Sequence, residues 1–196
     1  MDVAPADCAV LVGVALRAPD FVRQVRAPQS HAALVARAST RSPDEVYARR
    51  WAQQAGHVGR ILDDLHELGV LVVEEWARLE QLDLVTRGRA AVVVATHNTG
   101  AALQMHDAYA PHDTVAAAVG AYRGCLDLCS CRSIDLLPLV RAAAPDARLV
   151  IAKRKLSLVF HMSLIRATLR SLAVRPRPYE HALSEVAAEF VLRSME

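Results

Sequence analysis

Apolar residues recur at helical spacing in the first half of the chain. Between residues 57 and 68 they are Val58, Ile61, Leu62, Leu65 and Leu68. Because residues three and four positions apart share one face, this stretch predicts an amphipathic helix, which Gly69 ends. Two upstream helices are also predicted, one capped by Ser30 and one with Ser42 at the cap and Pro43 in the first position.

The pattern changes after Gly69. Residues 70–73 (VLVV) are short and β-branched, which favours a strand. Residues 82–85 (LDLV) alternate apolar and polar side chains, and they predict a second strand that pairs back as a hairpin. The polar residues 74–81 suit a hairpin tip, although alone they are equally consistent with a helical turn. A closing helix is predicted over residues 86–95, with Thr86 as its cap.

Helix, helix, helix, hairpin and helix is the order of a winged helix-turn-helix. Residues 29–92, and above all the stretch HVGRILDDLHELGVLVV, resemble bacterial transcription regulators of the MarR and ArsR types. Those families usually leave two residues between a threonine and a glycine after the wing, whereas only Arg87 separates Thr86 from Gly88 here. The resemblance implies a supporting helix over 43–51 and a recognition helix over 55–68.

The resemblance also implies which residues touch DNA. The start of such a recognition helix reads base edges in the major groove, and flanking arginines hold the phosphate backbone. The base-reading positions are Gln53, Gln54, His57 and Arg60, the backbone contacts are Arg49 and Arg50, and the wing-tip contact is Arg78.

The charge of this module argues against strong DNA binding. Between residues 31 and 91, eight arginines stand against nine acidic residues. Non-specific affinity for DNA comes largely from neutralising phosphates, so a partner subunit or another segment would have to supply charge. Leucine-striped helices that end in Gly-Val also occur in helical bundles. The alternative is therefore a viral or bacterial accessory factor that binds another protein and uses the winged fold as scaffold.

A basic segment lies in the second half of the chain. Residues 147–179 hold eight basic side chains and no acidic one. If residues 148–174 form one helix, four of them fall within roughly 60° of one another. They are Arg148, Lys155, Arg166 and Arg170. This basic face suits phosphate, anionic lipid or an acidic protein partner, and a solvated face on a dimerisation helix is the alternative. The two arginines inside the apolar stretch 156–174 argue against a membrane span.

Histidine and cysteine are concentrated between residues 97 and 131. Six of the chain's twelve lie there: His97, His106, His112, Cys125, Cys129 and Cys131. On a helix, Cys125 and Cys129 would share a face and could bind zinc or another transition metal, with His106 and His112 as further ligands. The spacing is not that of a standard zinc site, and burial as small apolar residues is the alternative. A metal- or thiol-sensing regulator is thus a third, weaker interpretation.

Residues 92–100 (VVVATHNTG) also resemble the opening strand and phosphate loop of the pyrophosphatases that clear inosine triphosphate. Ala101 stands near the place of that family's phosphate-binding lysine, and no acidic metal-binding motif follows. Elsewhere, no serine, histidine and aspartate arrangement and no carboxylate pair stands out. The sequence therefore predicts a protein that is not an enzyme.

With 53% apolar and 22% charged residues, the chain is predicted to be globular and mainly α. We expect a winged-helix module with a small β hairpin over residues 19–92, then a helical dimerisation or sensing domain over 93–196 that ends in an amphipathic helix. The expected function is a DNA-binding transcriptional regulator that meets double-stranded DNA as a homodimer. No basic residue precedes the first apolar run, as one would in a signal peptide, and four cysteines suggest reduced thiols, so the expected location is cytoplasmic.

Overall fold

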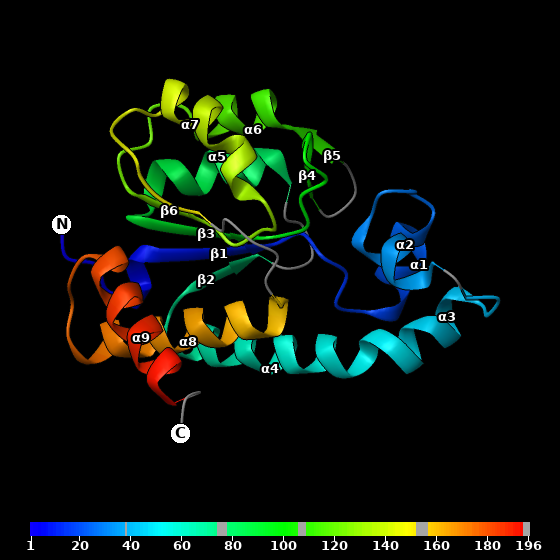
Figure 1. Ribbon diagram of the computed structural model, residues 1–196. Coiled ribbons are helices and arrows are strands. Elements are labelled where there is room, and N and C mark those ends of the chain that lie inside the picture. The colour runs from blue at the N-terminus through cyan, green and yellow to red at the C-terminus, as the bar shows by residue number, and fades with distance from the viewer. Residues whose placement is uncertain (38, 74–77, 106–108, 152–156, 194–196) are drawn as a thin grey trace.

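Five parallel strands form the central sheet of the computed structural model, which describes residues 1–37, 39–73, 78–105, 109–151 and 157–193 (Figure 1). Their order across the sheet is β2-β1-β3-β6-β7. The strands are β1 (Cys8–Val12), β2 (Leu71–Val73), β3 (Ala91–Ala95), β6 (Cys125–Leu128) and β7 (Arg148–Ile151). A separate antiparallel ribbon pairs β4 (Ala102–Gln104) with β5 (Tyr109–Pro111).

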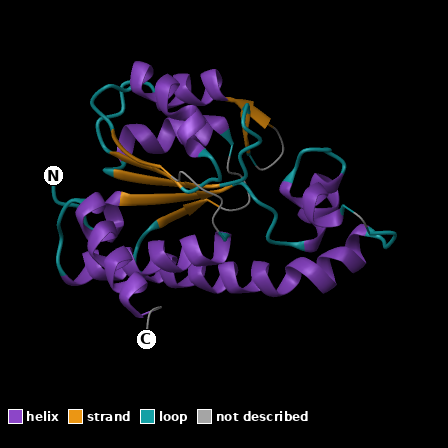
Figure 2. Ribbon diagram, in the orientation of Figure 1, coloured by secondary structure: helices purple, strands orange, loops and turns teal. Residues whose placement is uncertain are grey.

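Helices cover both faces of this sheet (Figure 2). One face carries α5 (Leu79–Gly88), α6 (His112–Val119) and α7 (Leu137–Ala143). The other carries α4 (Ala52–Glu67), α8 (Leu158–Val174) and α9 (Tyr179–Arg193). Three short helices, α1 (Ala18–Val25), α2 (His31–Ala36) and α3 (Pro43–Val46), lie beyond the end of β1 (Figure 1). A π turn, Tyr47–Trp51, joins α3 to α4, and 3-10 turns occupy Pro5–Asp7 and Ser133–Leu136.

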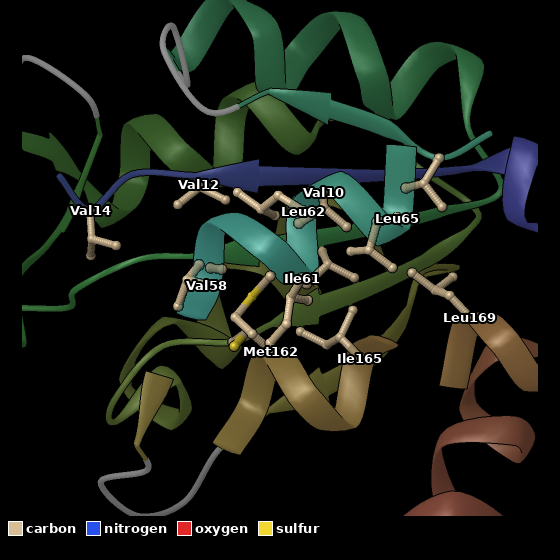
Figure 3. Close-up of a cluster of buried hydrophobic side chains, with 14 of the residues drawn as sticks. Val10, Val12, Val14, Val58, Ile61, Leu62, Leu65, Met162, Ile165 and Leu169 are labelled. Atoms are coloured by element: carbon tan, nitrogen blue, oxygen red, sulfur yellow. The ribbon is translucent and has the colours of Figure 1, made fainter. Parts of the chain in front are cut away.

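The strand residues are apolar on both sides because helices bury both faces of the sheet. Every residue of β1 is buried, and alternate residues belong to different cores. Val10 and Val12 pack with the α4, α8 and α9 layer, whereas Ala9 and Leu11 pack with the α5, α6 and α7 layer. Figure 3 shows the first of these cores, in which β1 meets α4 and α8. Its labelled helical residues are Val58, Ile61, Leu62, Leu65, Met162, Ile165 and Leu169.

The predicted mainly α winged helix is wrong, because the chain is an α/β protein with a five-stranded parallel sheet. The expected supporting and recognition helices, 43–51 and 55–68, belong to one uninterrupted helical run through α3, the π turn and α4. Residues 71–73 do form a strand, but it pairs in parallel with β1 rather than in a hairpin wing. Residue 92 is the expected end of the first domain, and strands that precede it (β1 and β2) and strands that follow it (β6 and β7) belong to the same sheet.

For two neighbouring stretches of the chain, the predicted helix and strand are reversed in the structure. The stretch 82–85, predicted as a strand, lies within α5, and the stretch 86–95, predicted as a helix, contains β3. Thr86 does not cap a helix; its hydroxyl donates to the carbonyl of Leu82 inside α5, at 3.0 Å. The error has a physical cause, since a short apolar run carries no periodicity that separates a buried strand from a buried helix. The strand implied by the pyrophosphatase resemblance is present as β3.

Apart from the Thr86 cap, the predictions that rest on local chemistry are confirmed. The hydroxyl of Ser30 accepts a hydrogen bond from the backbone N–H of Ala33 at 2.9 Å. Ser42 accepts one from the N–H of Glu45, whose carboxylate accepts the N–H of Ser42 in return, at 3.1 Å. Gly69 ends α4 in a left-handed conformation with φ of +82°. The C-terminal amphipathic helix is present as α9.

The single helix predicted over residues 148–174 is wrong, because residues 148–151 form the edge strand β7 and α8 begins only at Leu158. In the described part of the chain, no helix combines the length and apolar character needed to cross a membrane.

Candidate functional site

A small cavity lies where three neighbouring strands end. Because β1, β3 and β6 run in parallel, their carboxyl ends meet at one edge of the sheet. The chain continues from β1 toward one side of the sheet and from β3 toward the other, and open α/β sheets commonly bind ligands at such a reversal. Val14, Thr96 and Cys129 follow these three strands, and all of them line a cavity of about 110 Å³.

Three histidines and two cysteines meet at this space, which we call the His-Cys cavity. His31 comes from the start of α2, His97 from the loop after β3, and His161 from α8. Cys129 and Cys131 come from the segment directly after β6. Histidine and cysteine residues from four separate parts of the fold therefore line one cavity.

Cys131 differs from the other thiols in its exposure. All four cysteines are free, and Cys8, Cys125 and Cys129 are buried, whereas Cys131 is only half-buried. Burial raises the pKa of Cys8 to about 12 and that of Cys129 well above its usual range. The thiolate is the reactive form of cysteine, so the buried thiols are poor nucleophiles. Cys131 is the thiol that a substrate or reagent can reach.

The histidines of the cavity also differ from one another. Burial, with a smaller contribution from His97, lowers the pKa of His31 to about 4. Burial lowers the pKa of His161 as well. The ring of His31 packs against Trp51 at a centroid distance of 4.4 Å and lies 6.1 Å from the ring of His97. His31 is consequently neutral and structural in character at neutral pH.

Gln104 fixes the position of the His97 loop. Its backbone N–H donates to the carbonyl of His97 at 2.8 Å. Its side-chain amide donates to the carbonyl of Gly13 at 3.2 Å, and its side-chain oxygen accepts the N–H of His31 at 2.8 Å. A Cβ at Gly13 would collide with the Gln104 carbonyl, so only glycine allows this approach. One buried glutamine thus joins the end of β1, the His97 loop and α2.

The segment after Cys131 has an unusual backbone. Arg132 has a φ of +55°, a left-handed conformation that non-glycine residues rarely adopt and that often occurs at functional sites. Its carbonyl accepts a hydrogen bond from the side-chain amide of Asn98 at 3.2 Å, and its guanidinium pairs with Asp135 at 3.1 Å. The turn that follows the exposed thiol is therefore held in place from both its backbone and its side chain.

The predicted metal ligands are distributed as follows. Cys125 lies in β6 and Cys129 just beyond it, so the helical face predicted to hold both is absent. The ring of His112 is hydrogen-bonded to Asn98 at 3.0 Å, and His106 lies outside the described residues. Among the residues that the structure describes, no group of three or more histidine, cysteine or acidic side chains is arranged to hold a metal ion.

Six of the seven predicted DNA contacts lie along one helical run, and Arg78 lies outside it. Arg49 and Arg50 are in the π turn, Gln53, Gln54, His57 and Arg60 are on α4, and Arg78 directly precedes α5. All are exposed except His57, which is half-buried. The opposite face of α4 packs on β1 and α8 (Figure 3). DNA binding by these residues stays a prediction, but the chain does not form the winged helix from which it was inferred.

The predicted basic face is divided between a strand and a helix. Arg148 lies on β7 and pairs with Glu180 of α9 at 2.8 Å. Arg166 and Arg170 lie on α8 and both pair with Asp64 of α4, at 3.1 and 2.9 Å. Lys155 lies outside the described residues. The three described arginines therefore bind acidic groups of the chain itself.

In the sequence, His97 and Cys131 belong to one segment rich in histidine and cysteine, but nothing there pairs them with each other. The available signal is that each follows a short, wholly apolar or nearly apolar run, which is typical of buried parallel strands whose carboxyl ends form a site. Comparisons of the chain with protein-family models, with curated proteins and with solved structures found no match.

Proposed function

We propose that the protein is a cysteine-dependent hydrolase in which Cys131 is the nucleophile and His97 the general base. One observation carries the proposal. The half-buried thiol of Cys131 and the imidazole of His97 line the same cavity, at the carboxyl ends of the adjacent parallel strands β6 and β3. A thiol beside an imidazole is the nucleophile and base pair of many acyl-transfer enzymes.

The proposed reaction begins when His97 takes the proton from the sulfur of Cys131. The thiolate attacks the carbonyl carbon of an amide or ester, and the protonated imidazole gives its proton to the departing amine or alcohol. Water then attacks the thioester, with His97 as base. The hydroxyl of that water joins the acyl carbon, and the proton returns to the sulfur, so the enzyme is regenerated.

His97 suits the role of base better than the other two cavity histidines. A general base works best when its pKa lies near the working pH. With a pKa of about 4, His31 is too weak a base at neutral pH, and burial also lowers the pKa of His161. His97 follows the strand that pairs directly with the strand before Cys131, and Gln104 and Asn98 hold the segment around it.

Ser130 supports the presence of a ligand in this cavity. Ser130 is one of the residues that line the cavity, and its hydroxyl is buried without a hydrogen-bond partner among the described residues. Buried polar groups are nearly always paired, so a bound substrate or water is the expected partner. This orphaned hydroxyl adjoins the proposed nucleophile in the chain.

The non-enzymatic regulator expected from the sequence depended on a winged helix that the chain does not form. No specific contact of the described residues favours it over the cavity. Whether the protein is an enzyme is decided by the chemistry of Cys131, which can be measured directly.

Alkylation by limiting iodoacetamide tests the pairing. We expect Cys131 to be modified first, and His97→Ala to slow its modification at pH 7 about tenfold or more, because less thiolate is present. His181→Ala, which removes an exposed histidine elsewhere, serves as the matched control and should leave the rate unchanged. Equal rates with and without His97 would contradict the proposal.

Hydrolysis is tested on a pooled library of internally quenched peptides. We expect the wild-type protein to cleave members of the library, and both Cys131→Ala and His97→Ala to abolish cleavage. Cys8→Ser changes a buried thiol away from the cavity and should keep activity if the protein folds. Cleavage that persists in Cys131→Ala would overturn the assignment of the nucleophile.

A further inference from the structure

A second hollow adjoins the His-Cys cavity. It has a volume of about 270 Å³ and shares His97 and Cys131 with that cavity. Pockets for drug-sized ligands have volumes of roughly 300–1,000 Å³, so this hollow suits a single side chain better than a whole small molecule. If a substrate carbonyl lies between His97 and Cys131, the side chain of the substrate residue that bears this carbonyl lies next to the His-Cys cavity or next to the second hollow.

The walls of the second hollow carry positive charge. Its lining consists of Gln29, Leu34, Arg37, His97, Asn98, Thr99, Cys131 and Arg132. Two of these are arginines, and none of the described residues that line the hollow is acidic. A buried or half-buried carboxylate favours such surroundings, because opposite charge offsets part of its desolvation cost.

Both arginines keep donors available. Among the described residues Arg37 forms no ion pair; its guanidinium donates to the backbone carbonyl of Pro28 at 3.3 Å. Arg132 pairs with Asp135, which neutralises part of its charge, yet its side chain stays 61% exposed. A guanidinium has five N–H donors, so one partner leaves others free to bind a carboxylate.

We propose that this hollow, the arginine subsite, binds the side chain of an aspartate or glutamate that supplies the carbonyl under attack. The inference rests on the proposed hydrolase function. The side chain of that substrate residue is the one nearest to the attacked carbon, and Cys131 and His97 form part of the subsite wall. Arg37 supplies a positive charge that no ion pair among the described residues offsets, and two of its N–H groups can bind both oxygens of a carboxylate. Arg132 adds a second set of N–H donors.

Peptidyl acyloxymethyl ketones test the subsite, since they alkylate a nucleophilic thiol and differ only in the side chain presented. The rate of modification of Cys131 is measured by mass spectrometry for matched pairs that carry Asp or Asn, and Glu or Gln. We expect the acidic member of a pair to react at least about tenfold faster, because a hydrogen bond to a charged group is worth that much.

Variants of Arg37 identify the source of the preference. Arg37→Ala should bring the Asp-to-Asn ratio close to one, and Arg37→Lys should keep part of it. The control is Arg41→Ala, because Arg41 is an exposed arginine close in the chain that does not line the hollow. It should behave as wild type.

The outcomes separate the two proposals. If iodoacetamide alkylation depends on His97 but Asp and Asn ketones react equally, the arginine subsite is wrong and the hydrolase proposal stands. Failure of all four ketones to modify Cys131 also overturns the subsite. If alkylation of Cys131 is independent of His97 as well, both proposals fail together.

Discussion

The side-chain amide of Asn98 donates a hydrogen bond to the backbone carbonyl of Arg132 across 3.2 Å. This bond joins the two loops of the proposed reaction, because Asn98 directly follows His97 and Arg132 directly follows Cys131. The oxygen of the same amide accepts the N–H of Gly100 at 2.8 Å and bonds the His112 ring. With 5% of its surface exposed, Asn98 is a positioning residue that fixes the distance between the loops.

Replacing Asn98 should therefore affect both stability and the reactivity of Cys131. Asn98→Ala leaves three polar groups without their partner and should lower the free energy of unfolding by about 1–3 kcal/mol. It should also slow iodoacetamide modification of Cys131 in the folded protein. Asn98→Asp keeps the acceptor but loses the donor to Arg132, so it should reproduce the slower modification. Urea denaturation and alkylation kinetics measure the two effects, with the exposed amide change Gln53→Ala as control. Wild-type reactivity in Asn98→Ala would refute the positioning role.

Local chemistry in the sequence correctly predicted the helix starts at Ser30 and Ser42 and the helix end at Gly69, but the cap predicted at Thr86 was wrong. Ser42 and Glu45 are three residues apart, so their reciprocal hydrogen bonds depend on nothing distant. The strand β3 depends on distant residues, because its neighbours β1 and β6 come from well before and well after it in the chain. Its side chains are buried on both faces and so show no alternation. Secondary structure was thus readable at the helix caps and ambiguous in the sheet.

The candidate site was predictable only in part. The enrichment of histidine and cysteine between residues 97 and 131 marked the right segment. The pairing within it was missed, because a helical interpretation placed Cys125 beside Cys129. In the structure Cys125 lies in β6 and Cys129 directly follows it; both are buried, whereas Cys131 is half-buried. Which thiol reaches which imidazole follows from strand order, and strand order is a long-range property.

Asp64 holds two helices together, since it pairs with Arg166 and Arg170 of α8 from its place on α4. Asp64→Asn should lower the free energy of unfolding by about 1 kcal/mol at low salt, because half-exposed ion pairs contribute little individually. The difference should shrink in 1 M sodium chloride, where screening weakens the wild-type pairs. Asp63→Asn is the matched control, because Asp63 is the exposed neighbour and should change stability little. An Asp64→Asn effect that does not respond to salt would show that the pairs are not its cause.

Two glycines of one helical region should respond to alanine with opposite signs. Gly59 lies inside α4, and a Cβ there would meet open space, so Gly59→Ala should raise the free energy of unfolding by about 0.5–1 kcal/mol. Gly69 has a φ of +82°, which alanine adopts only with strain, so Gly69→Ala should lower it by about 1 kcal/mol. Urea midpoints with unchanged slopes would establish both values. Equal signs for the two changes would contradict this account of how α4 ends.

Asp127, a residue of β6, has a buried carboxyl group. Burial raises its pKa to about 6, although a hydrogen bond from the hydroxyl of Tyr179, at 2.8 Å, opposes the shift. Its pKa is close to 4 when unfolded, so the folded protein binds the proton more tightly between these values. The contribution of Asp127 to stability is therefore greatest below pH 4 and is lost as pH rises through 6.

Asp127→Asn removes this titration while it keeps an acceptor for Tyr179. The stability of the variant relative to wild type should rise between pH 4 and pH 7, by up to about 3 kcal/mol, because only the wild type must bury a charge at the higher pH. Urea denaturation at pH 4, 5, 6 and 7 measures the difference, and the exposed change Asp63→Asn should give no such trend. A difference that is constant across this range would mean that Asp127 titrates normally in the folded protein. A difference that falls with pH would mean that its charged form is the one the fold stabilises.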